Sequence, residues 1–353
     1  MQSIKASEYS IYFNQEGYQM LNAWISDSNY SKLFLLVDEH TNEFCLPKLL
    51  PKLEVEIPIE IIEIEAGEEM KTISTCVEIW SILSDLGADR KSAVINLGGG
   101  VITDIGGFVA ATFKRGIDFI NIPTSLLGMV DASIGGKNGV DLGNLKNQIG
   151  VIIPPKLVLI DTDFLETLPQ NQMKSGLAEM LKHGLIYDKN YWLQFKNLNE
   201  LNFDDFDTLI HRSIEIKNEI VSQDPTENGI RKALNFGHTL GHAIESHFLD
   251  TSTPLLHGEA VAIGMILESY ISKEKKLISE EDYCEIKNTL LAIYEKPIFS
   301  KKDQESIINL LIHDKKNEYG KVQFALIQNI GAIVLNQSAD NELIIESFKE
   351  YQS

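Results

Sequence analysis

Short apolar runs alternate with helix-like segments through the first half of the chain. The segment 71–86 spaces its apolar residues at helical intervals and ends at Gly87, which predicts a helix. Strands that alternate with helices predict an α/β domain with a mostly parallel sheet, helices on both faces, and ligands beyond the carboxyl ends of the strands. The runs that predict strands are residues 32–37, 57–64, 93–97, 119–122 and 157–160.

The pattern changes after Pro169, where helical periodicity replaces the strand-like runs. At 353 residues the chain exceeds what one hydrophobic core usually supports, so two domains are expected. We predict an α/β domain at residues 1–166 and a mostly α-helical domain at residues 167–353. Helices are predicted at residues 176–186, 206–222, 233–247, 259–275 and 281–293, and strands return at residues 322–326 and 332–335.

Composition narrows the class of partner. The chain has 51 acidic and 31 basic residues and a net charge of −20, which argues against nucleic acid or an anionic membrane as the main partner. Cys45, Cys76 and Cys284 are widely spaced, which fits a reducing compartment and predicts three core thiols. The N-terminal segment lacks a signal-peptide pattern, and the apolar window 93–113 contains Asp104. We therefore expect a cytoplasmic protein.

More than half of the 24 glycines fall between positions 87 and 150. Three of them, at positions 98–100, follow a predicted strand and precede a predicted helix, so backbone N–H groups there can bind a phosphate. The spacing differs from the GxGxxG dinucleotide motif, because Thr103 stands at the third position. A tight structural turn explains the run about as well. Asp38, which ends an early strand, can accept ribose hydroxyls or cap a helix.

Charged and amide side chains follow within the same glycine-rich region. Lys137, Lys146 and Asn147 lie near Asp131, and Arg115 precedes them. Lysines among glycines suit a phosphorylated or carboxylated small molecule better than they suit a solvated loop.

A metal site is indicated in the second half. His238 and His242 are four residues apart and share a helix face, and His257 opens the next predicted helix. Glu179, on an earlier predicted helix, adds a carboxylate, and one glutamate with two histidines and an open position is the pattern of catalytic zinc. Any single histidine is better explained as a core residue, but the set favours a metal. The spacing does not decide whether His238 and His242 are both ligands or one of them carries a proton.

Further polar residues surround these candidates in the sequence. Lys182 lies one turn after Glu179 and faces the same way. Lys217, Arg231, Asn235 and the segment 313–316 add groups that together describe a polyanion site beside a metal and a nucleotide.

Several long motifs identify a family. In chain order they are GGGVITDIGGFVAATFKRG, DASIGGKNGVD, LKNQIG, GLAEMLKHG, NFGHTLGHAIE, HGEAVAIGM and DKKNEYGKVQFALIQNIG, and they resemble the 3-dehydroquinate synthases of the shikimate pathway, which are sugar phosphate cyclases. The resemblance runs from about residue 38 to residue 331. It implies an N-terminal NAD-binding domain, a helical metal-binding domain, one zinc or cobalt ion, a phosphorylated sugar acid as substrate, and a homodimer.

The resemblance also implies a role for each matching position. Glu179, His238 and His257 match the metal ligands, and His242 matches a catalytic or substrate-contacting residue. Arg115 matches an arginine that reaches the site of the neighbouring subunit. The positions that match NAD contacts are Asp38, Glu68, Lys71, Gly99, Gly100, Val101, Asp104, Thr124, Ser125, Leu127, Phe164, Thr167 and Leu168. The positions that match substrate contacts are Asp131, Lys137, Lys146, Asn147, Lys182, Lys217, Arg231, Asn235 and one of Lys315 and Lys316, with Lys137 and Lys146 also near NAD.

The chain departs from the family pattern at three positions. Ser125 stands where a second threonine is common, Asn138 replaces the usual threonine, and His183 replaces a common tyrosine. Because Asn138 adjoins Lys137, we expect that it can shift substrate preference. Two alternatives remain open: another cyclase of the 2-deoxy-scyllo-inosose synthase type, and a metal-dependent NAD alcohol dehydrogenase of the glycerol dehydrogenase type.

Overall fold

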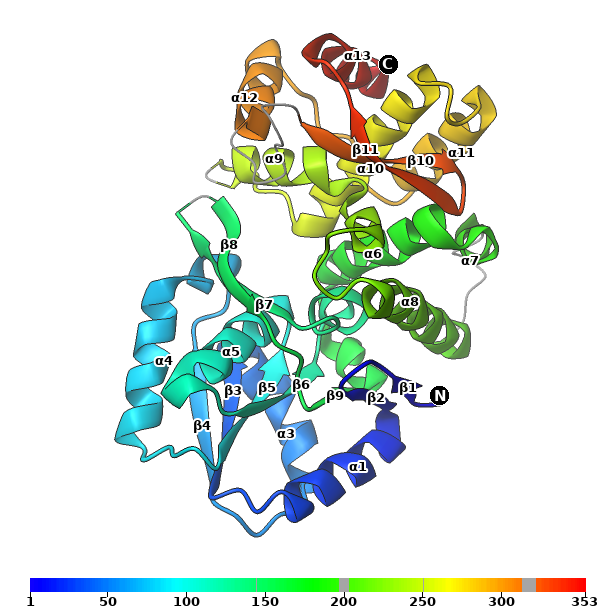
Figure 1. The fold of residues 1–353 in the computed structure, drawn as a ribbon. Coiled ribbons are helices and arrows are strands. Elements are labelled where there is room, and N and C mark those ends of the chain that lie inside the picture. Colours follow the sequence, from blue (N-terminus) through cyan, green and yellow to red (C-terminus); the bar gives the residue numbers. More distant parts are fainter. Residues whose placement is uncertain (144, 197–202, 250, 313–321) are drawn as a thin grey trace. The chain divides into compact units, whose positions relative to one another are not determined.

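The computed structural model describes residues 1–143, 145–196, 203–249, 251–312 and 322–353 (Figure 1). The chain forms two compact units, Met1–Met173 and Lys174–Ser353, which are considered one at a time below. The division expected from the sequence lies between residues 166 and 167, at the end of a short 3-10 helix, η5 (Thr162–Thr167). It precedes the boundary between the two units, which falls after Met173.

The first unit is built on a seven-stranded sheet in the order β1-β2-β9-β6-β5-β3-β4 (Figure 1). β1 and β2 pair in antiparallel fashion, and the other neighbours pair in parallel, so the prediction of a mostly parallel sheet is confirmed. The strands are β1 (Ile4–Lys5), β2 (Ser10–Phe13), β3 (Lys32–Asp38), β4 (Ile59–Ile64), β5 (Ser92–Gly98), β6 (Asp118–Pro123) and β9 (Leu157–Ile160).

Helices cover this sheet. α4 (Ile73–Asp85) and α5 (Gly100–Thr112) bury apolar side chains in one core cluster with Phe34, Val94 and Phe119 of the strands. The predicted helix 71–86 begins slightly late, because Thr72 adopts an extended backbone and its side chain caps α4. The remaining helical segments of the unit are α1 (Asn14–Asp27), α2 (Glu39–Phe44), α3 (Leu46–Leu49), η1 (Leu50–Lys52), η2 (Glu68–Met70), η3 (Phe113–Arg115) and η4 (Gly128–Ala132).

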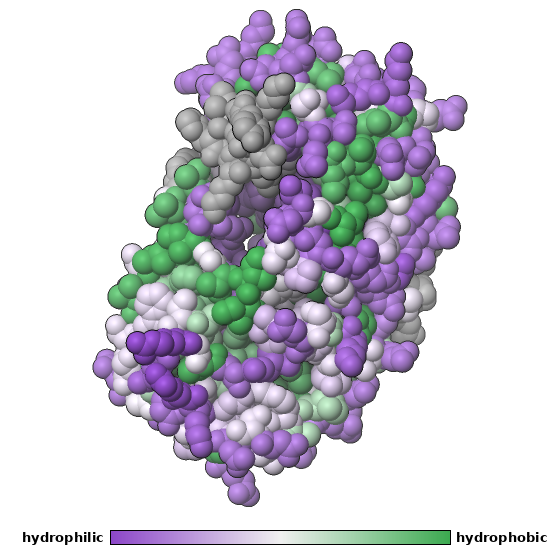
Figure 2. Space-filling view, viewed as in Figure 1, coloured by the Kyte–Doolittle hydropathy of each residue, from purple (hydrophilic) through white to green (hydrophobic). Residues whose placement is uncertain are grey.

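A separate hairpin of β7 (Lys137–Leu142) and β8 (Leu145–Ile152) packs beside α5. Its outer positions include Leu142 and Ile152, whose side chains are exposed. Polar residues cover much of the visible surface, with apolar patches between them (Figure 2).

The second unit is mostly helical, as predicted. Its central helix, α10 (His257–Glu274), is buried along most of its length and packs against α9 (His238–Phe248), α11 (Glu280–Leu291) and α13 (Asn341–Gln352). The other elements are α6 (Gln170–Tyr187), which begins just before the unit, α7 (Lys189–Gln194), α8 (Phe203–Gln223), η7 (Ile230–Asn235), α12 (Lys301–Ile312), β10 (Gln323–Asn329) and β11 (Ala332–Ser338).

One predicted helix is wrong. The segment 233–247 is divided between η7 and α9, because Gly237 lies between them with a left-handed backbone at φ 77°. A helix cannot continue through that conformation, and glycine adopts it without the steric cost of a Cβ atom. Among the described residues, none of the helices combines the length and apolar character needed to cross a membrane.

The cysteines differ from the expectation of three core thiols. Cys45 and Cys76 are buried, but Cys284 is exposed on α11, so that part of the prediction is wrong. Burial raises the pKa of the Cys45 thiol to about 11 and that of Cys76 to about 12.

This difference predicts selective thiol labelling. At pH 8 the native protein should react rapidly with one equivalent of an aromatic disulfide reagent, and the denatured protein with all three cysteines. Cys284→Ser should remove the fast reaction, whereas Cys76→Ser should leave it unchanged. Two or more fast equivalents in the native protein would contradict the observed burial.

Candidate nucleotide and metal sites

The strand order of the first unit reverses between β3 and β5. The chain passes from β3 to β4 on one side and from β5 through α5 to β6 on the other. The register pairs Leu36 with Asn96, so Asp38 and Gly98 both lie at the carboxyl edge of this reversal. Open α/β sheets bind nucleotides at such a switch point. Asp38 and the glycine run that starts at Gly98, which are expected to contact NAD, therefore lie where the topology favours a nucleotide.

The glycine run forms the turn between β5 and α5. A Cβ atom on Gly98 would lie 2.5 Å from side-chain carbons of Ile102, so this glycine is needed for the turn itself. Gly99 stands at the N-cap of α5, and within the described residues no side chain caps that helix end. The glycine run can therefore serve both as a tight structural turn and as an anion-binding site, because the uncapped N–H groups can bind a phosphate.

Asp38 caps a helix. Its Oδ1 accepts hydrogen bonds from the backbone N–H of Thr41 at 2.7 Å and from the Thr41 hydroxyl at 3.0 Å, at the start of α2. A contact of Asp38 with a ribose stays a prediction from the resemblance.

Five residues expected to bind NAD or substrate form two neighbouring groups of polar contacts. The Nζ atom of buried Lys71 lies 2.6 Å from Oδ2 of Asp104 and 2.7 Å from Oδ1 of Asn147. Nearby, Lys146 donates to Oε1 of Glu68 at 2.8 Å. Burial alone would lower the pKa of Lys71, but Asp104 and then Glu68 raise it above its usual value. The structure thus brings these five residues together and keeps Lys71 charged.

The other residues of this unit that we expect in the NAD and substrate sites lie between positions 101 and 168. The Ser125 hydroxyl accepts from the N–H of Gly128 at 3.1 Å, and Arg115 has a left-handed backbone at φ 72°. Thr124 and Phe164 are buried, whereas Lys137 is exposed at the start of β7. The rest are placed as follows: Val101 in α5, Leu127 just before η4, Asp131 in η4, and Thr167 with Leu168 at the end of η5.

Asn138 has a structural role in the hairpin. Its buried amide donates hydrogen bonds to the carbonyl oxygens of Gly136 and Ile153, each at 2.8 Å. These bonds brace the base of the β7–β8 hairpin. The amide is therefore engaged with backbone, and an effect of Asn138 on substrate preference would act through the position of its neighbour Lys137.

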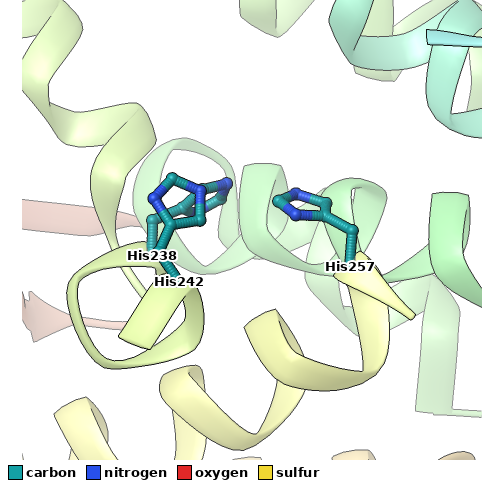
Figure 3. A group of neighbouring side chains, drawn as sticks. All are labelled: His238, His242 and His257. Carbon is teal, nitrogen blue, oxygen red and sulfur yellow. The ribbon is translucent and has the colours of Figure 1, made fainter. Parts of the chain in front are cut away.

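In the second unit three imidazoles converge. His238 and His242 project from one side of α9 and His257 from the start of α10, with their rings facing a common point (Figure 3). The ring centroids lie 5.1, 5.3 and 5.7 Å apart, and ligand atoms of all three lie within 4.8 Å of one another.

Glu179 of α6 joins this cluster. Its Oε1 lies 3.4 Å from Nε2 of His238 and 3.6 Å from Nε2 of His257. Two ligands that are each about 2.0–2.2 Å from a tetrahedral zinc ion lie roughly 3.3–3.6 Å apart. These distances fit Glu179, His238 and His257 as a ligand set, and His242 stands close enough to be a fourth donor or to contact a bound molecule.

Glycine contacts set the spacing of these helices. A Cβ atom on Gly258 would lie 2.2 Å from the carbonyl oxygen of Ser175, and the N–H of Gly258 donates to the Ser175 hydroxyl at 2.9 Å. The start of α10, which carries His257, is thereby held against α6 at Ser175, one turn before Glu179. Only a residue without a side chain permits this approach.

Burial and neighbouring charges shift the pKa values of the groups in the cluster. Burial alone would raise the pKa of Glu179, but the ion pair with buried Lys182, and then His238, hold it well below its usual value. Burial lowers the pKa of His238 to about 4, and Lys182 adds to this shift. Burial also opposes protonation of His257, but Glu245 and then Glu179 raise its pKa to about 10. The cluster thus offers an ionised carboxylate and a neutral imidazole to a cation.

Lys217, on α8, and Arg231, on η7, are both buried. Nη1 of Arg231 donates to the carbonyl oxygen of Pro225 at 2.6 Å, and the Asn235 amide donates to Oε1 of Glu227 at 3.0 Å. The expected residues Lys315 and Lys316 lie outside the described residues.

His183 is explained by packing. Its ring is fully buried in α6, and Nδ1 lies 2.7 Å from the Ser213 hydroxyl of α8. This departure from the family pattern therefore belongs to the helix–helix core.

Two residues with a role in this site were missed in the sequence, Ser175 and Glu245. Glu245 lies seven residues after His238 and three after His242, so helical periodicity already placed it on the same face. No comparable signal marks Ser175, because its contact with Gly258 joins segments far apart in the chain.

Comparisons with known proteins point to one family. Residues 61–175 match the family described as 3-dehydroquinate synthase N-terminal, and residues 176–317 match 3-dehydroquinate synthase C-terminal. A 3-dehydroquinate synthase from Parabacteroides distasonis is 43% identical over 334 residues, which cover 94% of each chain. One from Prochlorococcus marinus is 39% identical over 325 residues, covering 90% of this chain and 89% of the relative.

Solved structures extend the likeness. A 2-deoxy-scyllo-inosose synthase complexed with carbaglucose-6-phosphate, NAD+ and Co2+ superposes with a TM-score of 0.85 at 26% identity, covering 99% of both chains. A 2-epi-5-epi-valiolone synthase from Streptomyces hygroscopicus with NAD+ and Zn2+ bound gives 0.86 at 26% identity, covering 100% of this chain and 99% of the other. A glycerol dehydrogenase from Schizosaccharomyces pombe, at 12% identity and a TM-score of 0.66, covers 99% of this chain and 89% of the other and shares the fold alone.

Fold and site together define an enzyme of the sugar phosphate cyclase class. Within that class, the chain belongs to the 3-dehydroquinate synthase family.

Proposed function

We propose that this chain converts 3-deoxy-D-arabino-heptulosonate 7-phosphate to 3-dehydroquinate and phosphate in the shikimate pathway. The observation that carries the proposal is the placing of Glu179, His238 and His257 at ligand-to-ligand distances, in a chain that matches the family from residue 61 to residue 317. The cofactors are NAD and one divalent metal ion, zinc or cobalt, which are the groups bound in the two related cyclase structures.

When bound, NAD supplies reversible hydride transfer, and the metal polarises the hydroxyl oxygen that is oxidised. Because the hydride returns in the same turnover, the net reaction is elimination of phosphate followed by ring opening and an intramolecular aldol closure. Glu179 enters this chemistry as an ionised ligand, since Lys182 keeps its pKa low. His242 contacts the substrate and moves a proton at its imidazole.

The substrate carries two anionic groups at opposite ends. Arg231 and Lys217 bind its carboxylate, for which a guanidinium offers paired donors. Lys137 and Asn147 bind its phosphate. Further contacts come from Asp131, Lys146, Lys182, Asn235 and one of Lys315 and Lys316.

We further propose a cytoplasmic homodimer in which Arg115 reaches the site of the neighbouring subunit. The resemblance supports this assembly, and the net charge of −20 supports a small-molecule substrate over nucleic acid or a membrane.

The two alternatives make different demands on the same residues. A cyclase of the 2-deoxy-scyllo-inosose synthase type acts on a sugar phosphate without a carboxylate. It would not need buried Arg231 and Lys217 as a pair of cations that binds a carboxylate. An alcohol dehydrogenase of the same fold would need fewer anion-binding lysines and would accumulate NADH.

Two parallel reactions distinguish the three activities. The purified enzyme is incubated with catalytic NAD, zinc or cobalt, and the heptulosonate phosphate, while phosphate, absorbance at the NADH wavelength and organic product are followed. We expect phosphate and 3-dehydroquinate in equal amounts with no accumulation of NADH. Turnover in the parallel reaction, in which glucose 6-phosphate replaces the heptulosonate phosphate, or conversion of all the added NAD to NADH, would reject the proposal.

A further inference from the structure

A buried carboxylate contacts His257 on the side away from the three-histidine cluster. Glu245 lies on α9 with 7% of its surface exposed, and its Oε2 is 3.1 Å from Nδ1 of His257. The other ring nitrogen of His257, Nε2, faces Glu179 at 3.6 Å. The imidazole therefore lies between two carboxylates, one on the side of the cluster and one behind it.

We propose that Glu245 is a positioning residue of the metal site. By accepting the Nδ1–H of His257 it keeps a proton on that nitrogen, so that Nε2 is the ring atom left to bind the metal, and it holds the ring in the orientation that faces Glu179. A carboxylate behind a ligating imidazole also makes the imidazole a stronger donor. The inference rests on the proposed function only in that it requires a divalent metal at this cluster.

The second histidine of the ligand set is held differently. Nδ1 of His238 lies 3.1 Å from the carbonyl oxygen of Phe236, the residue just before the left-handed Gly237. A backbone carbonyl fixes the tautomer but carries no net charge. Glu245 therefore adds a negative charge behind His257, whereas Nδ1 of His238 faces a neutral carbonyl. The two imidazoles are thus unequal donors, and removal of the charge should affect the metal through His257.

The chain offers a matched control on the same helix. His247 of α9 lies with its Nε2 atom 3.0 Å from Oδ1 of Asp303 on α12, a carboxylate–histidine pair that is partly exposed. His247 is absent from the three-histidine cluster that could hold a metal. Asp303→Asn therefore removes a carboxylate from a histidine without altering the proposed site.

The test measures metal binding by the full-length protein in the absence of NAD and substrate. Metal-free wild type, Glu245→Gln, Glu245→Ala and Asp303→Asn are titrated with Zn2+ in competition with a chromophoric chelator, and with Co2+ while its visible absorption bands are recorded. We expect a roughly 10- to 100-fold loss of zinc affinity in Glu245→Ala. Glu245→Gln should lose less, since its amide oxygen can still accept the Nδ1–H, and its cobalt spectrum should shift because the charge is gone.

Asp303→Asn should bind both metals like the wild type. Wild-type zinc affinity and an unchanged cobalt spectrum in both Glu245 variants would overturn the proposal, as would an equal loss of affinity in Asp303→Asn. If Glu245→Ala fails to fold, Glu245→Gln still decides the matter, because it preserves volume and one acceptor. The readout is separate from turnover: release of phosphate by the wild type tests the reaction, whereas the variants test only how its metal is held.

Discussion

Replacing His257 by alanine is expected to abolish tight metal binding and phosphate release together, whereas His242→Ala should keep the metal and lose turnover. Tetrahedral structural zinc is held by about 10–16 kcal/mol, or ~3 kcal/mol for each of four ligands, so removal of one ligand should weaken binding roughly a hundredfold. His257 lies at ligand distance from Glu179, with Nε2 at 3.6 Å from Oε1, and so belongs to the proposed ligand set.

Two measurements separate these roles. Metal content after gel filtration and the zinc dissociation constant report ligation, and the rate of phosphate release at saturating metal reports catalysis. For His242→Ala we expect full metal content with a rate lowered by about 10²–10⁴, the usual contribution of a positioned acid or base. Equal metal loss in both variants would instead make the three histidines, which lie within 4.8 Å of one another, the ligand set.

The central strands could be predicted because burial leaves a plain record in the sequence. β3, β5 and β9 are nearly continuous apolar runs, as expected for strands of a parallel sheet covered on both faces. The β7–β8 hairpin left no such record, because only the middle of β7 is buried, β8 has exposed and half-buried positions alone, and the residues include lysines, asparagines and glycines. The same residues in the sequence indicated a ligand loop instead.

The candidate site was predictable in its parts and not in its arrangement. Helical spacing placed His238 and His242 on one face. The structure adds what spacing cannot give, which is the approach of His257 from a second helix (Figure 3). The distances from Glu179 fit the ligand set that the resemblance implies, and the three histidines also lie close enough to share a metal, so the choice between the two sets stays a prediction. Such distances depend on how helices pack, which a linear pattern does not encode.

Close packing of α9 on α10 leads to the second large effect, expected for Gly264→Ala. A Cβ atom on Gly264 would lie 1.9 Å from the carbonyl oxygen of Gly237, where ordinary contact begins at 3.4 Å. Backbone atoms cannot rotate away as a side chain can, so the two helices must separate. We expect the free energy of unfolding to fall by about 1–3 kcal/mol, the usual cost of overpacking a core, measured by urea denaturation of the metal-free protein.

Gly229→Ala is the control, because the nearest atoms to its added Cβ lie 3.6 Å away. Its stability should stay close to that of the wild type. Equal stability of Gly264→Ala and the wild type would show that the contact between α9 and α10 is looser than the structure has it.

The same substitution should weaken metal binding, because α9 carries His238 and α10 carries His257. Glu268, one turn after Gly264, accepts hydrogen bonds from the N–H groups of Gly237 at 2.7 Å and Leu240 at 3.0 Å and so ties the start of α9 to α10. A metal that binds only the folded state stabilises it by an amount that grows with the ratio of its concentration to the dissociation constant. Added zinc should therefore raise the melting temperature of Gly264→Ala less than that of the wild type or Gly229→Ala. An equal rise in all three would mean one of two things. Either the ligands keep their spacing when the helices part, or Glu179 and His257, on α6 and α10, hold the metal without His238 of α9.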